Sequence, residues 1–251
     1  MATTEPMDET TDLALDAEDN EDAEDDLSLV DVLIGRAASY RLFSRMFLSP
    51  LSDSDIDDFI ARDFISMAAQ FDDNDLLAEG FNDIGRALKR RNTGTRQQLA
   101  TDYTMCFDGV ETVGGEVAAP YASVFLGEKA LLNQEPRHEV YKIYRSEAIA
   151  PDGRVNLPED HLSFELDFLA VLSGQAAVAL EQDDVAEVLR ILDVSQSFIV
   201  NNILTWLDML TELANKVLKT RFYKGALKAT KGYLELDQLV IADIKEMLSD
   251  E

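Results

Sequence analysis

The sequence predicts an all-α protein, folded as a single multi-helix bundle of about ten helices. Apolar residues recur along most of the chain at the spacing of about 3.6 residues that a helix requires. We find neither a convincing alternating strand pattern nor a hairpin turn of the Asn-Gly kind. Hydrophobic residues make up 46% of the 251 residues, which is typical of a globular chain with a real core.

The first half of the predicted body, residues 29–150, contains several helices of moderate length. A helix over 29–48 ends before Pro50, because the residue before a proline resists the helical conformation. The helices expected after it are a short one capped by Ser52 or Asp53, one that opens at Asn74 or Asp75 and closes before Gly94, and two over 95–107 and 137–147. Glycines and a proline predict a loop over 109–120, and 121–132 is expected to be a short helix or irregular.

The second half, residues 158–251, is predicted to begin with a helix that runs to about residue 181. Pro158 suits its first position, and Glu159 and Asp160 in the first turn favour the positive end of the helix dipole. The next pattern restarts at Asp183 or Asp184 and breaks near Asn201-Asn202. Further helices are expected from there to Val217, over 222–233 and over 236–248. A turn signal at 151–153 predicts a hinge over 151–157 between the two halves.

Charge is distributed unevenly along the chain. The formal net charge is −27, and residues 1–26 hold 12 acidic residues and no basic one. We therefore predict that 1–28 is a disordered acidic tail, because it cannot bury enough apolar area to offset the entropy of ordering. The acidic body disfavours nucleic acid and anionic lipid and attracts cationic partners. A basic stripe over 216–231 is interpreted as a solvated helix face that pairs with acids elsewhere.

The compartment expected from the sequence is the cytoplasm. The single cysteine, Cys106, excludes an internal disulfide and a cysteine-built metal site, and we expect it to be buried. No uninterrupted apolar run reaches 18 residues, and the N-terminus shows no secretory signal pattern. We therefore predict neither membrane insertion nor export. Trp206 and Met209 are expected in the core.

One dense polar cluster, Glu159-Asp160-His161, follows a proline-bounded loop. His161 and Glu165 are four residues apart and share a helix face, although helix capping explains the same pattern. The only Glu-x-x-His sequence starts at Glu135, and with two histidines in the chain no paired di-iron motif is possible. Glycine-rich nucleotide motifs are absent, and Ser123 is not in a nucleophile elbow. The residues alone thus predict no catalytic constellation, metal or cofactor.

The stretch 158–169, which reads PEDHLSFELDFL, resembles the Pro-x-Asp-His-(Leu/Ile)-x-x-Glu-Leu-x-Phe signature of the TorD/DmsD/NarJ chaperones. Three further blocks agree with that family in order and spacing. They are the first helix over 36–50, the Asp102-Tyr103 to Phe125 region with PYASVF at 120–125, and the C-terminal block with Phe198, Trp206 and Phe222-Tyr223. Two positions depart from the family pattern: Leu157 replaces a common glutamate, and Asn201-Asn202 replace two familiar histidines.

The resemblance implies an all-helical cytoplasmic chaperone that is not an enzyme and needs no cofactor. Its expected partner is the apo catalytic subunit of a molybdopterin oxidoreductase, held through its twin-arginine signal peptide until the molybdenum cofactor is inserted. Carboxylates next to an apolar groove around Leu162, Phe164 and Phe168 suit such a peptide. The expected peptide-binding residues are Tyr121, Ser123, Glu159, Asp160, His161 and Glu165, with Asp167 nearby.

Other function classes remain open from the sequence. One is a helical carboxylate metalloprotein or a nucleotide-hydrolysing enzyme, and another is a structural assembly subunit without a client. The resemblance also leaves a monomer and a domain-swapped dimer as alternatives, because the hinge permits either.

Overall fold

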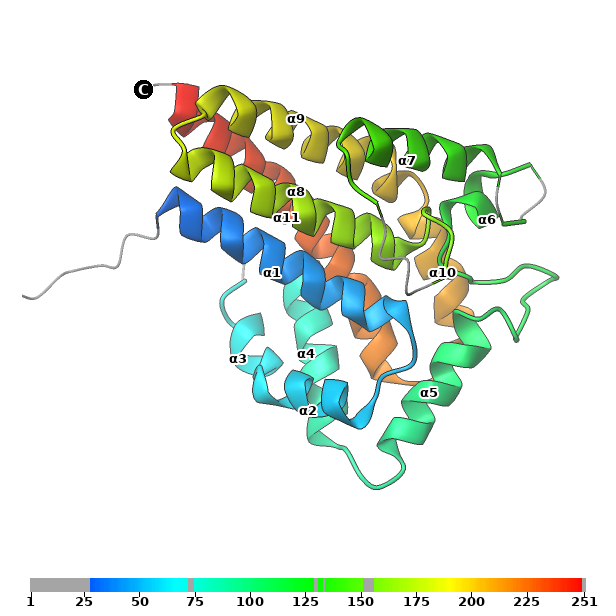
Figure 1. Cartoon of the computed structure of the whole chain (residues 1–251). Helices are drawn as coiled ribbons and strands as arrows, with labels where there is room; N and C mark the ends of the chain where they lie inside the picture. Colours follow the sequence, from blue (N-terminus) through cyan, green and yellow to red (C-terminus); the bar gives the residue numbers. More distant parts are fainter. Residues whose placement is uncertain (1–27, 72–74, 129–130, 133, 151–155, 250–251) are drawn as a thin grey trace, which may run out of the picture.

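The computed structural model describes residues 28–71, 75–128, 131–132, 134–150 and 156–249, which form a bundle of α-helices (Figure 1). These residues contain two isolated β-bridges and no β-strand, so the all-α class is confirmed. The first helices are α1 (Leu29–Leu48), α2 (Asp53–Ala61), α3 (Phe64–Ala68), α4 (Asp75–Lys89), α5 (Thr95–Cys106), α6 (Ala122–Leu126) and α7 (Glu135–Ser146). The remaining ones are α8 (Leu162–Glu181), α9 (Val185–Asn201), the short 3-10 helix η1 (Ile203–Thr205), α10 (Leu207–Val217) and α11 (Arg221–Ser249).

Side-chain caps explain why several helices begin where the sequence predicts. The Ser28 side chain accepts the backbone N–H of Asp31, so the residue predicted to end the acidic tail caps α1. Ser52 and Asp55 form a reciprocal capping box at α2, and Asp184 accepts the N–H of Glu187 at α9. The predicted break near 201–202 is also confirmed, because α9 ends at Asn201.

The core joins the two predicted halves. α8 lies between α1 and α9, and α11 runs behind them against α4 (Figure 1). Aromatic rings fill the space between the helices: Phe43 stacks parallel to Phe81 at 6.1 Å, and Phe59 stacks on Phe222 at 5.9 Å. Helices from residues 29–150 and from 158–249 therefore share one hydrophobic core. The tail over 1–27 and most of the predicted hinge, 151–155, lie outside the described residues.

A buried ion pair links α1 to α11. Arg36 donates two hydrogen bonds to Asp237, at 2.6 and 2.8 Å, and the Tyr40 hydroxyl donates a third at 2.5 Å. All three side chains are almost completely buried. Because the pair is buried, removing either partner would leave the other as an uncompensated charge in the core.

Helices α4 and α11 approach each other very closely where they cross. A Cβ atom added at Gly80 would lie 2.4 Å from the backbone nitrogen of Ala229, and one added at Gly225 would lie 2.7 Å from the Gly80 carbonyl oxygen. Only glycine fits at these two positions, so the pair sets the distance between the helices.

Three expectations about helices are wrong. The short helix α3 was not predicted, and it begins after Asp63, whose φ of 42° and side chain form its cap. The two helices expected over 222–233 and 236–248 are one continuous helix, α11, because the Glu235 region contains no residue that breaks a helix. The helix expected from Pro158 begins at Leu162 instead, with His161 as its cap.

Helix α8 also refines the expectation about membranes. By length and composition it is apolar enough to cross a membrane, although Glu165 and Asp167 interrupt its apolar run. However, 72% of the 18-residue apolar stretch within this helix is buried inside the protein, between α1 and α9. Its apolar character is therefore explained by its central position in the bundle.

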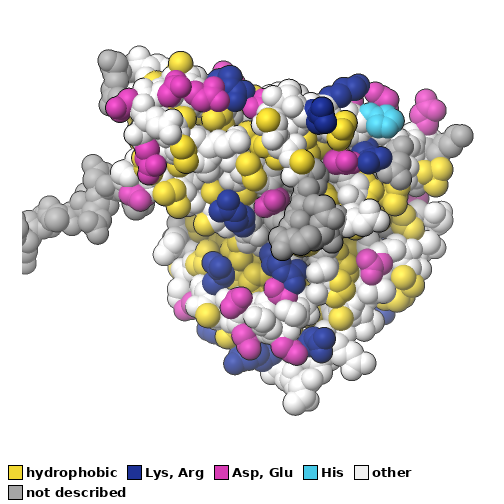
Figure 2. All heavy atoms as spheres, in the orientation of Figure 1, with side chains coloured by type: hydrophobic (Ala, Val, Ile, Leu, Met, Phe, Trp, Pro, Cys, Tyr) yellow, Lys and Arg dark blue, Asp and Glu magenta, His cyan; other side chains and the backbone are white. Residues whose placement is uncertain are grey.

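The surface is mixed in charge. On the face shown in Figure 2, acidic and basic side chains are interspersed, with apolar side chains between them.

Cys106 is completely buried, as expected, whereas Met209 is 41% exposed, so its predicted core position is wrong. Four side chains of the basic stripe form ion pairs as predicted, namely Lys216, Arg221, Lys228 and Lys231.

Candidate functional site

Two segments far apart in the sequence cross in an antiparallel contact, and together they contain most of the predicted site residues. We call residues 120–123 and 158–162 the clasp. The Ala122 N–H donates to the Asp160 carbonyl at 3.0 Å, and the Leu162 N–H donates to the Pro120 carbonyl at 2.9 Å. Tyr121 and His161 face each other as an isolated β-bridge. The clasp therefore attaches the loop before α6 to the start of α8.

The clasp also explains why α8 begins four residues later than predicted. In a helix starting at Pro158, the Leu162 N–H would donate to the Pro158 carbonyl and the Asp160 carbonyl would accept the Phe164 N–H. Here these two groups bond to Pro120 and Ala122 instead, and the backbone stays extended at His161, where φ is −76° and ψ is 133°. A contact between residues about 40 positions apart thus displaces the local start signal.

Asp160 caps α6 from outside that helix. Its Oδ2 accepts the backbone N–H of Ser123 at 2.8 Å, while the cap residue of α6 itself, Tyr121, makes no capping bond through its side chain. Both Asp160 and Ser123 are completely buried. Ser123 in turn accepts the Gln134 N–H through its Oγ at 3.3 Å, which connects α6 to the start of α7. A single carboxylate thereby positions a five-residue helix that is too short to be stable alone.

His161 acts as a neutral cap of α8. Its Nδ1 accepts the backbone N–H of Ser163 at 3.1 Å, and its ring lies edge-on to Tyr121 with centroids 4.7 Å apart. The side chain is 2% exposed, and burial lowers its pKa to about 3. The imidazole is therefore uncharged at neutral pH.

Glu165 lies completely buried one turn into α8. Burial raises the pKa of this carboxyl well above its usual value, and the neighbouring Asp160 raises it further, while interaction with the Trp206 indole acts in the opposite direction. Neither carboxyl oxygen makes a hydrogen bond of regular geometry. These conditions favour the protonated form of Glu165, which has no charge to offer a cation.

The outer side of the clasp keeps some polar groups accessible. Glu159 pairs with Arg137 of α7 at 2.5 Å, and that interaction overcomes partial burial to lower the pKa of the carboxyl. The Tyr144 hydroxyl donates to the Glu159 carbonyl at 3.3 Å. Tyr121 is half-buried and Asp167 is exposed. Of the six predicted residues, only Tyr121 and Glu159 thus reach the surface.

A groove lies between α6 and α10. We call it the α6–α10 groove; it has a volume of about 230 Å³. Its lining residues are Glu116, Val117, Val124, Phe125, Met209, Glu212, Leu213 and Lys216. Phe125 stacks on Trp206 at 5.7 Å, so the groove and the buried Glu165 region share an aromatic wall. The carboxylate of Glu212 is paired with Lys216 at 3.0 Å, whereas Glu116 is exposed.

The groove is the feature that sequence reasoning missed. Met209 and Leu213, one turn apart, lie beside the fully buried row of Leu207, Leu210 and Ala214. A surface helix usually buries only one apolar stripe. The apolar residues of α10 cover a wider part of its surface than that stripe, and this excess was the sequence signal for a groove.

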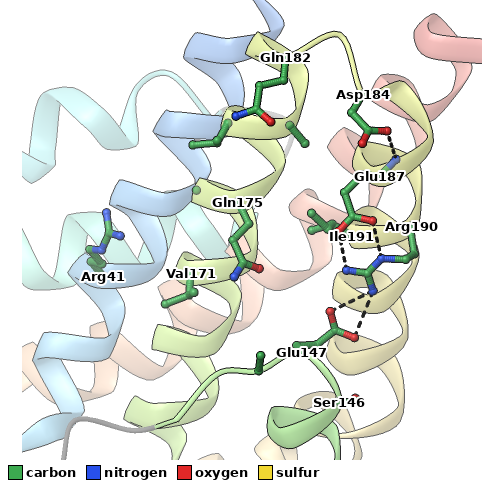
Figure 3. Close-up of a pocket in the computed structure, with 14 residues that line it drawn as sticks. Arg41, Ser146, Glu147, Val171, Gln175, Gln182, Asp184, Glu187, Arg190 and Ile191 are labelled. Atoms are coloured by element: carbon green, nitrogen blue, oxygen red, sulfur yellow. Dashed lines mark hydrogen bonds and ion pairs between the residues drawn. The ribbon is translucent and has the colours of Figure 1, made fainter.

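A larger cavity of about 630 Å³ lies on the face formed by α1, α8 and α9 (Figure 3). Figure 3 shows Arg190 of α9 between Glu187 and Glu147, at 2.7 and 2.9 Å, with Arg41 of α1 on the other side of the cavity. The charges of Arg190 and its two partners are already satisfied by one another. This cavity is separate from the clasp and contains none of the predicted site residues.

The described residues hold no group of three or more His, Cys, Asp or Glu side chains arranged to bind a metal ion. His161 and Glu165 are poorly suited to general acid–base catalysis, because His161 is neutral and Glu165 is buried away from solvent. The arrangement is suited to holding a short helix in place beside a groove.

Comparison with known proteins gives a consistent picture. Residues 73–212 match the family model described as nitrate reductase delta subunit. The chaperone protein TorD of Vibrio parahaemolyticus is 29% identical over 205 residues, covering 80% of this chain and 92% of the relative. The proteins of the same name from Vibrio atlanticus and Photobacterium profundum are 25% and 24% identical, covering 82% and 80% of this chain and 94% and 92% of the relatives.

Proposed function

The chain belongs to the nitrate reductase delta subunit family, and on that premise we propose that it is a chaperone for the maturation of a redox enzyme. Its relatives across four-fifths of the chain are named chaperones, a role without catalysis. In finer detail, we propose a cytoplasmic protein that binds the twin-arginine signal peptide of an apo molybdopterin oxidoreductase. Binding would hold back export until the cofactor is inserted.

The observation that carries the peptide-binding proposal is the α6–α10 groove beside the clasp. A twin-arginine peptide combines two guanidinium groups with an apolar stretch. The groove combines Val124, Phe125 and Met209 with the exposed carboxylate of Glu116 and with Glu212, which would exchange its ion pair with Lys216 for one with an arginine. Guanidinium–carboxylate contacts give specificity and the apolar lining gives affinity, as is usual where a helix or strand docks in a groove.

The six residues predicted from the sequence then divide into two roles. Asp160, His161, Ser123 and Glu165 are buried, so we propose that they position α6 and the groove wall without touching the peptide. Tyr121 and Glu159 reach the surface on the outer side of the clasp, where we propose that they contact the client next to its signal peptide. The hinge over 151–157 is proposed to permit a monomer or a domain-swapped dimer.

The test is calorimetric titration of a synthetic peptide in which two arginines precede an apolar stretch. Met209→Lys places a cation in the groove and is expected to weaken binding about tenfold or more. Met247→Lys is the matched control, since Met247 is exposed on the last turns of α11 and is not part of the α6–α10 groove. Equal affinities for the two variants would place the peptide elsewhere.

The buried residues that position α6 and the start of α8 are tested by a second pair of variants. Asp160→Ala leaves the Ser123 N–H buried without an acceptor, so α6 is expected to loosen and peptide affinity to fall. His161→Ala is expected to act in the same direction through the start of α8. Unchanged affinities in folded variants would remove the clasp from the binding mechanism.

Two further measurements distinguish charged from purely apolar peptide docking and a chaperone from an enzyme. Peptide affinity is expected to fall as ionic strength rises, because exposed guanidinium–carboxylate pairs are screened by salt, and a flat response would indicate purely apolar docking. Capture of partners from the native cell is expected to recover a molybdopterin oxidoreductase. Bound metal in the purified protein, or nucleotide turnover, would favour the enzyme class instead.

A further inference from the structure

A cavity of about 700 Å³ on a different side of the bundle is lined mainly by cations. It lies between α4, the end of α10 and the start of α11, and we call it the cationic cavity. Its charged lining residues are the cations Arg86, Lys219, Arg221, Lys224 and Lys228 and the carboxylates Glu79 and Asp83. Five positive and two negative groups leave a formal excess of three positive charges, in a chain whose net charge is −27.

The carboxylates in the cavity satisfy only part of this charge. Lys228 contacts Glu79 at 3.0 Å and Asp83 at 3.1 Å, and Arg221 contacts Asp83 at 3.4 Å. In the part of the chain that the structure describes, no ion pair involves Lys219, Lys224 or Arg86. Asn82 and Asn215 add amide groups to the same lining. The cavity thus presents unpaired cations and hydrogen-bond donors on one surface, which is the chemistry that receives a polyanion.

We infer that the cationic cavity binds a peptide segment rich in aspartate and glutamate, and that its occupant is residues 5–18 of this same chain. Six of these fourteen residues are acidic: Glu5, Asp8, Glu9, Asp12, Asp16 and Glu18. The segment contains no basic residue that would be repelled by the cavity. Charge complementarity within one chain therefore identifies the partner.

The described geometry places the cavity within reach of this segment. Helices α1 and α11 run in opposite directions, because Arg36 contacts Asp237 while Phe43, further along α1, contacts Tyr233. Lys224 precedes Asp237 by 13 residues, which is about 20 Å along a helix, and Ser28 precedes Arg36 by eight residues, or about 12 Å in the other direction. Figure 1 shows the start of α1 and the end of α11 at the same end of the bundle.

The span from Ser28 to Lys224 is therefore roughly 32 Å, and ten extended residues cover about 33–36 Å. Residues from Glu18 toward the N-terminus therefore reach the cavity, whereas residues 19–27 lie too close to the start of α1 to do so. Because the contact is intramolecular, it operates at an effective concentration of the order of millimolar, so weak individual ion pairs suffice. A more anionic or more abundant partner would have to displace the segment before using the same cations.

The experiment is zero-length carbodiimide cross-linking of the full chain, followed by mass spectrometry of the joined peptides. The reaction condenses a carboxylate with a lysine amine in direct contact, with loss of water. Cross-links from residues 5–18 to Lys219, Lys224 or Lys228 are expected to exceed those to Lys142 at least fivefold. Lys142 is the control because it is 69% exposed on α7. The excess is expected to disappear at 0.5 M salt.

Charge reversal provides the second measurement. In the full chain, Lys219→Glu with Lys224→Glu is expected to abolish the excess, while Lys142→Glu leaves it unchanged; thermal unfolding verifies that both variants fold. Cross-links spread evenly over exposed lysines would overturn the inference. So would absence of the excess together with tight binding of pyrophosphate at the same lysines, which would assign the cavity to a phosphate-bearing ligand.

Discussion

Replacing Gly80 by alanine is expected to force α4 and α11 apart. The new Cβ would lie 2.4 Å from the backbone nitrogen of Ala229 and 2.7 Å from its Cα and Cβ, whereas ordinary contact begins near 3.4 Å. The obstacle is the backbone of α11, which cannot rotate away as a flexible side chain does. The helices must therefore separate by about 1 Å, against a core that is packed like a crystal.

The magnitude follows from two opposing effects. Overpacking a core costs about 1–3 kcal/mol, and the rigid obstacle places this case at the upper end. Alanine in place of glycine within a helix returns about 1 kcal/mol. The free energy of unfolding is thus expected to fall by about 2 kcal/mol. For a body of this size that corresponds to roughly 4–8 °C in Tm.

The assay is thermal and urea unfolding of Gly80→Ala beside Gly174→Ala. Gly174 lies within α8, where an added Cβ meets no atom within 4 Å. This control therefore gains the helix propensity of alanine without a steric clash, and it is expected to stabilise the protein by about 0.5–1 kcal/mol. Opposite signs for the two variants support the reasoning. A Gly80→Ala protein as stable as Gly174→Ala would refute it.

Three more predictions concern buried polar groups. Burial raises the pKa of Glu165 in the folded state, so stability is lost as pH rises above 4.5; Glu165→Gln is expected to be more stable than wild type at pH 7, with the difference vanishing near pH 4 in urea titrations. His161 has its pKa lowered to about 3, so the stability of wild type relative to His161→Asn is expected to fall by about 1.4 kcal/mol per pH unit as pH falls below 6.5. His161→Asn keeps a capping acceptor and should lack that slope between pH 7 and 5. Asp102 accepts the N–H groups of Lys219 and Thr220 at the start of α11, so Asp102→Ala is expected to cost about 1–3 kcal/mol by urea unfolding, and Asp102→Asn less.

The contact between the two segments of the clasp involves residues that the sequence singled out, but the burial of those residues was not predictable. The sequence placed the key residues at 121–125 and 158–165, and the structure brings these stretches together. It also buries Asp160, His161, Ser123 and Glu165, which the sequence had assigned to the peptide surface. Burial depends on which side of a helix faces a neighbour, and an irregular segment such as 158–161 has no periodicity from which to read that.

The sequence by itself determined the helical class, most helix positions and the break at 201–202, because these depend on local capping groups and on the period of apolar residues. Only the tertiary structure decided where α8 begins and that Met209 lies on the surface. It also decided that a cation-lined cavity forms where α4 meets α11. Each of these depends on hydrogen bonds or packing between residues many positions apart, which leave no local signature in the chain.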